Sequence, residues 1–169
     1  MTTAAPRVLD PCCGSRMFYV NKQHPDVLYG DKRRETLTVT DRTRGLDGTR
    51  TLHVAPDMLM DFTALPFADR KFNLVVFDPP HLKRAGAKSW LAAKYGKLPT
   101  NWQDEITAGF AECFRVLADN GTLIFKWNET QISLRDVLSC TPIEPLFANK
   151  AGKAALSHWV VFMKPRQAA

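Results

Sequence analysis

The chain has 169 residues, of which 45% are hydrophobic and 24% charged. This balance is typical of a folded domain and argues against disorder. The length favours one domain over 1–169 with a sizeable core. No apolar run approaches the roughly 18 residues that a membrane helix needs. Residues 1–6 lack the layout of a signal peptide, so we expect a cytoplasmic protein with no membrane partner.

The charge of the chain is basic, with a formal net charge of +6 and a pI near 9.3. Such a surface suits a polyanion partner. Much of the excess lies in one stretch, 82–103, which has no acid. Its cations are Lys83, Arg84, Lys88, Lys94 and Lys97.

The four cysteines, Cys12, Cys13, Cys113 and Cys140, show no paired spacing. A zinc site needs spaced pairs such as CxxC, and a disulfide framework is improbable in a cytosolic chain. We therefore expect reduced, mostly packed cysteines and no metal site.

The first part of the chain predicts strands that end in acids. An apolar run over 7–10 ends in Asp10, and a small-residue turn and a short helix over 17–22 are expected after it. A second run, 27–29, leads to Asp31. Alternating apolar residues over 36–55 surround a turn cluster and predict an inserted β-hairpin at the sheet edge, either a plain edge hairpin or a substrate arm.

The second part alternates strands with helical patterns. A run at 72–77 that is apolar except for Asn73 is typical of a central strand, and the long connection that follows it suggests function or mobility. The other expected elements are strands at 58–60 and 122–125, helices at 104–118 and 132–139, and a closing antiparallel pair at 144–147 and 158–163.

This alternation predicts an α/β domain with a mostly parallel sheet. Ligands of such sheets bind beyond the carboxyl ends of the strands. Asp10, Asp31, Asp61 and Asp78 all end strands, so we expect them along that one edge. The spacing from Asp10 to Asp31 suits a βαβ unit in which the second acid takes ribose hydroxyls.

The stretch Asp78-Pro79-Pro80-His81 forms a stiff corner after the central strand. Proline fixes φ, lacks an N–H and extends the residue before it. The corner therefore holds a carboxylate and free carbonyls in fixed directions, with a planar ring next to them. Such a group can accept hydrogen bonds from an amine, or it can be only a rigid turn.

Two motifs resemble those of class I S-adenosylmethionine (SAM)-dependent methyltransferases. The run at 9–15, Leu-Asp-Pro-Cys-Cys-Gly-Ser, is similar to their first motif in its amino-methyltransferase form. Asp78-Pro79-Pro80-His81 resembles their Asp-Pro-Pro-aromatic motif, and the likeness extends over about 7–165. This resemblance implies a Rossmann-like fold with a seven-stranded, mostly parallel sheet and an antiparallel C-terminal strand. Within the family, the chain resembles small phage or bacterial DNA N6-adenine methyltransferases.

The resemblance implies a SAM site on named residues. Asp10 would lie near the ammonium of the methionine portion, and Asp31 would take the ribose hydroxyls. Asp61 would accept from the adenine amino group, with Phe62 against its ring. The turn that brings the backbone to the methionine portion contains Pro11, Cys12 and Gly14.

The resemblance also implies the chemistry. Asp78 and the carbonyl of Pro79 would accept the hydrogens of an exocyclic amine, beside Pro80 and His81, and so free the lone pair of its nitrogen. An acid at the first position is usual for adenine N6. Two residues depart from the family's pattern: His81 stands at the aromatic position, and Arg16 replaces a glycine. We also expect no separate target-recognition domain.

We expect the nucleic acid, DNA before RNA, at the basic stretch and beside the fifth strand, because cations bind phosphates and aromatic rings stack on bases. The candidate substrate residues are Lys83, Arg84, Lys88, Trp90, Lys94, Tyr95, Lys97, Trp127 and Asn128. The alternatives are an RNA enzyme, a protein amide methyltransferase, or a silent nucleic-acid-binding subunit. A monomer or homodimer, in host cytoplasm if phage-encoded, is expected.

Overall fold

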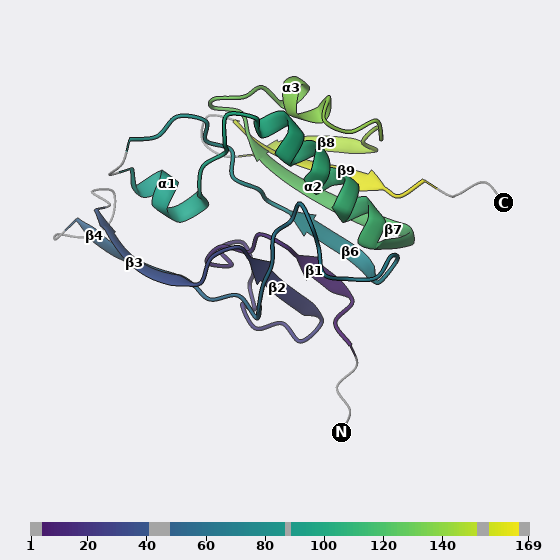
Figure 1. Ribbon diagram of the computed structural model, residues 1–169, viewed down its shortest axis with the longest axis horizontal. Helices are drawn as coiled ribbons and strands as arrows, with labels where there is room; N and C mark the ends of the chain where they lie inside the picture. The colour runs from purple at the N-terminus through teal and green to yellow at the C-terminus, as the bar shows by residue number, and fades with distance from the viewer. Residues whose placement is uncertain (1–4, 41–47, 87–88, 152–155, 166–169) are drawn as a thin grey trace.

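Seven strands form the central sheet of the computed structural model, which describes residues 5–40, 48–86, 89–151 and 156–165 (Figure 1). The order across the sheet is β5-β2-β1-β6-β7-β9-β8. The strands are β1 (Val8–Asp10), β2 (Val27–Asp31), β5 (Met58–Leu59), β6 (Phe72–Phe77), β7 (Leu117–Asn128), β8 (Phe147–Ala151) and β9 (Ser157–Met163).

The direction of the strands is parallel from β5 to β7, and β9 runs antiparallel to both β7 and β8. This confirms the expected mostly parallel sheet with an antiparallel C-terminal strand. The strand order reverses at β1, which pairs with β2 on one side and β6 on the other. Ligands of open α/β sheets bind at such a switch point, beyond the carboxyl ends of the strands.

The helix α2 (Trp102–Val116) covers one face of the sheet, as Figure 1 shows. Its Phe110 packs against Phe77 of β6 and Phe125 of β7, with ring centroids 5.5 and 4.9 Å apart. Gly109 allows this approach, because a Cβ there would lie 2.7 Å from the Phe77 ring. The apolar stripe of the 104–118 pattern therefore faces the core, as predicted. The five-residue α3 (Leu134–Leu138) follows β7.

The predicted hairpin is present as β3 (Glu35–Thr40) and β4 (Thr49–Val54). It forms its own two-stranded sheet and does not extend the central one. Leu52 and Val54 are buried, while the residues between them and before them are exposed or partly exposed. The predicted turn at 41–47 lies outside the described residues. Figure 1 shows the hairpin projecting from the body of the molecule near α1.

The predicted short helix over 17–22 is wrong, because this stretch forms turns. Arg16 has a φ of 53°, and its guanidinium donates to the carbonyl of Lys22 at 2.6 Å. This side-chain bond closes the segment into a loop. Aromatic and β-branched residues such as Phe18, Tyr19 and Val20 also have low helix propensity.

The long connection at 82–103 contains a helix that its polar composition did not predict, α1 (Trp90–Tyr95). Ser89 caps its first turn by accepting from the N–H of Ala92. Gly96, with a φ of 80°, ends it. The short cap-to-glycine distance leaves room for less than two turns, too little for a clear hydrophobic period.

The closing antiparallel pair is confirmed, although its first strand begins at Phe147 and not at Glu144. Asn149 and Lys150 lie within β8. Among the described residues, no helix is long and apolar enough to cross a membrane.

Candidate cofactor and substrate site

A cavity of about 550 Å³ opens at the carboxyl ends of β1, β2 and β6. Its volume is in the range of small-molecule sites. The lining combines the first-motif turn, the end of β2, the proline corner and the end of α1. The predicted site residues that line it are Pro11, Cys12, Gly14, Asp31, Phe62, Asp78, Pro80, Lys94, Tyr95 and Lys97.

The turn after β1 forms one wall of the cavity. Gly14 has a φ of 50°, a left-handed conformation that side chains rarely adopt. Its N–H donates to Oδ2 of Asp31 at 2.9 Å, and the N–H of Cys13 donates to the carbonyl of Gly30. A Cβ on Gly14 would meet no atom within 4 Å, so the missing side chain leaves open space beside the backbone. A ligand can therefore approach the main chain closely at this point.

Asp10 lies behind this wall and does not line the cavity. Its side chain is fully buried, and it accepts from the N–H of Cys12 at 3.2 Å and the hydroxyl of Tyr19 at 3.0 Å. Burial raises the pKa of Asp10 to about 8, with a smaller contribution from the charges of Asp78 and Asp31. A cation placed near this carboxyl would favour its ionised form.

Asp31 lines the cavity from the end of β2. Besides the Gly14 bond, its Oδ1 accepts from the backbone N–H of Arg33 at 2.9 Å and from Nε of Arg33 at 3.4 Å. A carboxylate has about four acceptor sites, so Asp31 retains capacity for a hydroxyl from a ligand. Arg33 also donates to the carbonyls of Ala93 and Lys94, which ties the end of β2 to α1.

Asp61 and Phe62, which follow β5, have different roles. Oδ1 of Asp61 accepts from the N–H and hydroxyl of Thr63, and Oδ2 pairs with Lys32 at 3.0 Å. Asp61 thus holds a local turn and does not line the cavity. Phe62 does line it, with its ring against Phe77 at 5.3 Å between centroids. Glu105, which the sequence did not single out, also lines the cavity.

Asp78 reaches the cavity from the carboxyl end of β6. Its Oδ2 accepts from Nζ of Lys126 at 2.9 Å. Burial raises the pKa of Asp78, and the positive charges of Lys126 and Lys94 oppose this rise. Lys126 also lines the cavity, with its ammonium 5.6 Å from the Phe18 ring and 5.8 Å from the Trp159 ring. The candidate acceptor of amine hydrogens is therefore paired with a lysine in the free protein.

His81 turns away from the cavity and packs inside. Its ring lies 5.2 Å from Tyr95 and 6.3 Å from Trp127, and only 8% of the residue is exposed. Burial, together with the charges of Lys126 and Lys94, lowers the pKa of His81 to about 4, so its imidazole is neutral at physiological pH. Tyr95 lines the cavity in its place.

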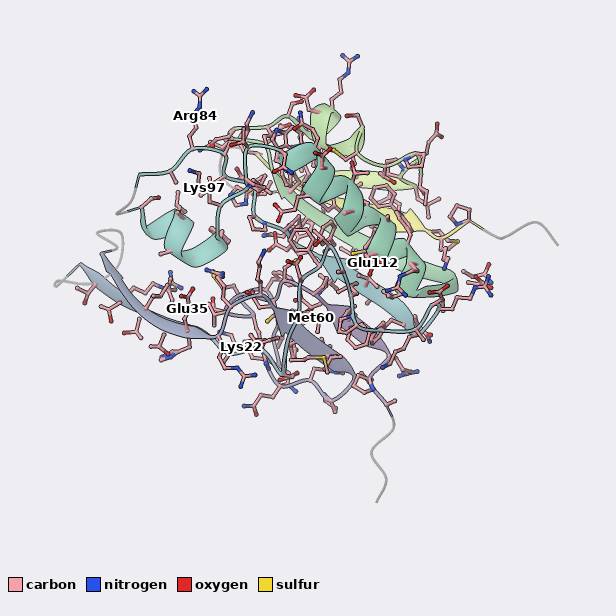
Figure 2. The ribbon with its side chains drawn as sticks, viewed as in Figure 1. Lys22, Glu35, Met60, Arg84, Lys97 and Glu112 are labelled. Atoms are coloured by element: carbon pink, nitrogen blue, oxygen red, sulfur yellow. The ribbon has the colours of Figure 1, made fainter. Side chains whose placement is uncertain are left out.

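The other predicted substrate residues lie at varied places. Trp127 is buried and donates from Nε1 to the carbonyl of Ile132, so it packs. Asn128 holds the turn after β7 by accepting from the N–H of Thr130. Lys83 and Arg84 are exposed, and their N–H groups donate to Gln131; Figure 2 shows Arg84 pointing away from the body.

Lys88 lies outside the described residues, and Trp90 begins α1. Pro79 lies within the corner but not in the cavity lining. No group of His, Cys, Asp and Glu within the described part of the chain is arranged to hold a metal ion.

Among the comparisons with known proteins, only the one with solved structures finds similar proteins. No protein-family model matches the sequence, and no curated protein is similar enough in sequence to count as a relative. Solved structures do match over nearly the whole chain. The PH0226 protein of Pyrococcus horikoshii OT3 is 15% identical, with a TM-score of 0.59, and covers 97% of this chain and 84% of its own.

Two further matches are named as SAM-dependent methyltransferases. The TehB-like enzyme of Corynebacterium glutamicum is 16% identical, covers 95% of this chain and 83% of its own, and has a TM-score of 0.54. The protein from Methanosarcina mazei is 13% identical, covers 95% and 92%, and has a TM-score of 0.54. The chain therefore has the Rossmann-like fold of class I SAM-dependent methyltransferases.

Proposed function

We propose that this protein is a SAM-dependent N-methyltransferase that acts on an exocyclic amine of a nucleic-acid base, with adenine N6 in DNA as the leading acceptor. One observation carries the proposal. Asp78 and Pro80 of the proline corner line the same cavity as Gly14 and Asp31 of the expected SAM site. A methyl donor bound on one wall would thus face an amine held at the other.

The residues present fit the cofactor. The open backbone at Gly14 suits the methionine portion, Asp31 suits the ribose hydroxyls, and Phe62 offers an apolar face for the adenine. Near the adenine end, Glu105 lies in the cavity lining while Asp61 is engaged with Thr63 and Lys32. Glu105 is therefore the better placed acceptor for the adenine amino group.

When bound, SAM supplies an electrophilic methyl group on a sulfonium sulfur. The protein has to orient the acceptor amine and to stabilise the positive charge that develops on its nitrogen. Asp78 can accept one N–H of the amine and hold the proton that the nitrogen loses after transfer. The extended, proline-fixed backbone keeps this carboxylate in place without reorganisation.

The base itself needs a flat surface and a cationic surround. Tyr95 provides a ring at the cavity, next to Pro80, where a splayed base could stack. Lys94 and Lys97 add positive charge to the same lining. A base in a duplex would have to flip out to reach Asp78.

The test is a transfer assay with labelled SAM that offers DNA, RNA and protein, followed by nucleoside analysis of the product. We expect N6-methyladenine in nucleic acid. Asp78→Ala should abolish transfer and leave SAM affinity, measured by calorimetry, nearly unchanged. Asp26→Ala, at the opposite edge of the sheet, is the matched control and should keep activity. Label in protein alone would refute the nucleic-acid assignment, and equal loss of binding and transfer would make Asp78 structural.

A further inference from the structure

Arg33 lies between two walls of the cofactor cavity. It follows the end of β2 and lines the cavity, with 27% of its side chain exposed. Its guanidinium contacts Asp31 on one side and the last turn of α1 on the other. One side chain therefore touches both the expected ribose acceptor and the helix that carries Tyr95.

On the cofactor side, Arg33 orients the carboxylate of Asp31. Oδ1 of Asp31 accepts from the backbone N–H of Arg33 at 2.9 Å and from its Nε at 3.4 Å, while Oδ2 accepts from the N–H of Gly14. Each carboxylate oxygen offers about two acceptor sites. Arg33 thus fills Oδ1 and leaves Oδ2 to accept a ligand hydroxyl. Glu35 pairs with Nη1 of Arg33 at 3.1 Å and helps to fix the guanidinium.

On the helix side, the same guanidinium binds the end of α1. Nη1 donates to the carbonyl of Ala93 at 3.0 Å, and Nη2 donates to that of Lys94 at 3.3 Å. The last four carbonyls of a helix have no partner within it, and arginine side chains can satisfy them. The planar fork of arginine donates in fixed directions, which the compact ammonium of a lysine does not reproduce.

The helix α1 depends on few contacts for its position. It has six residues, fewer than the roughly 12 at which an isolated helix is still only marginal in water. Of its described side chains, Leu91 is 37% exposed and only Lys94 is buried. Figure 1 shows α1 on the side of the hairpin and away from the central sheet. The ring of Tyr95 also packs on His81, but the bonds of Arg33 are what tie this helix to the cofactor side of the cavity.

We propose that Arg33 is a positioning residue that couples cofactor binding at Asp31 to acceptor binding at Tyr95. The inference rests on the proposed function and extends it to the mutual effect of the two ligands. A hydroxyl bound to Asp31 fixes the carboxylate that holds the guanidinium, and the guanidinium in turn fixes α1. The acceptor base then meets an ordered Tyr95 ring, so less conformational entropy is lost when it binds. Such coupling is reciprocal, so the acceptor strengthens cofactor binding by the same factor.

The experiment measures the affinity of the full chain for a labelled adenine-containing oligonucleotide with and without S-adenosylhomocysteine, which carries the ribose but no transferable methyl group. We expect S-adenosylhomocysteine to raise this affinity by at least about 5-fold, the lower end of typical coupling between sites. Arg33→Met keeps an apolar stem and removes every bond of the guanidinium, so S-adenosylhomocysteine should no longer change the affinity. Arg33→Lys keeps the charge beside Asp31 and Glu35 without the fork, and it should also lose the coupling. It decides the matter if Arg33→Met does not fold.

The matched control is Arg34→Met, which removes the same charge at the next residue. Arg34 is exposed, lies outside the cavity lining and donates to the carbonyl of Pro56. This variant should keep the coupling of the unmodified protein. An equal loss in the Arg33 and Arg34 variants would reduce the effect to overall charge and overturn the proposal. Full coupling in either Arg33 variant would overturn it as well.

Hydrogen exchange tests the same link without nucleic acid. The N–H groups of Ala93 and Gly96 close the turns of α1 by donating to Ser89 and Ala92. S-adenosylhomocysteine should slow their exchange in the unmodified protein and not in Arg33→Met. If the unmodified protein binds no nucleic acid, the proposed function fails, and this measurement still decides whether Arg33 joins the cofactor site to α1. If nucleic acid binds equally well with and without S-adenosylhomocysteine, the proposed function stands and the coupling is refuted.

Discussion

The buried carboxyl of Asp10 should make the cofactor-free protein less stable at neutral pH than an amide at the same position would. Asp10 is fully buried, and its pKa is raised from 3.8 to about 8. Asp10→Asn keeps the size and the acceptor for the N–H of Cys12. Its amide can also donate to the hydroxyl oxygen of Tyr19, so both hydrogen bonds survive.

The direction in which stability changes with pH follows from the number of protons that Asp10 binds in the folded and unfolded states. Between pH 3.8 and about 8 the folded protein holds a proton on Asp10 that the unfolded chain has released. Stability therefore falls as pH rises through this window. Each pH unit costs about 1.4 kcal/mol, so the deficit is about 4 kcal/mol at neutral pH and about 3 kcal/mol smaller near pH 5. The amide of Asn does not titrate, so it causes no loss of stability as pH rises.

Urea unfolding of the two proteins at both pH values measures this difference. We expect Asp10→Asn to have the higher free energy of unfolding at neutral pH, with the gap shrinking by about 3 kcal/mol toward pH 5. Asp26→Asn, an exposed acid paired with Arg7, is the control and should show no such gap. A gap that does not change with pH, or a less stable Asp10→Asn, would refute the reasoning. If Asp10→Asn gains stability but binds SAM more weakly, Asp10 lowers the stability of the fold and contributes to cofactor binding.

Substitutions at three other residues test the site. Lys126→Met removes the cation beside Asp78, so the pKa of Asp78 should rise and the increase of methyl transfer with pH should move upward; an unmoved pH-rate profile would contradict this. Gly14→Ala forces a side chain into φ 50° at a cost of about 1 kcal/mol, seen in urea unfolding, and should weaken SAM binding, seen by calorimetry. Tyr95→Ala should raise the KM for nucleic acid without changing SAM affinity, while Tyr95→Phe should not; equal effects of the two would exclude stacking.

The fold could be predicted largely from local patterns. The run at 72–77, apolar except for Asn73, is long enough to indicate a buried strand, and the alternation of strands and helices leaves few topologies. Acids that end parallel strands must share an edge, which is why Asp10, Asp31 and Asp78 do come together. The prediction of a helix at 17–22 is wrong because the Arg16 side chain closes this stretch into a loop by donating to the carbonyl of Lys22. A hydrophobic periodicity cannot reveal such a side-chain bond.

The contacts of the site depend on information that local patterns lack. The pair of Asp78 and Lys126 follows from the register of β6 on β7, in which Phe77 lies opposite Phe125. No spacing in the sequence encodes that register. Asp61 could have been placed better, since an acid two residues before a threonine commonly accepts from its backbone and hydroxyl.

At the proline corner, the aromatic ring that lines the cavity does not come from the residue at the aromatic position of the motif. The residue after Pro80 is His81, and its neutral ring packs between Tyr95 and Trp127 instead of lining the cavity. Gly96 explains how α1 fills the gap: a Cβ there would lie 3.1 Å from Cγ of Pro80, so glycine lets the end of α1 approach the corner. Tyr95, the residue before it, then lines the cavity with His81 behind it. The flat face at the cavity thus comes from Tyr95 of α1, and His81 supports that ring from behind.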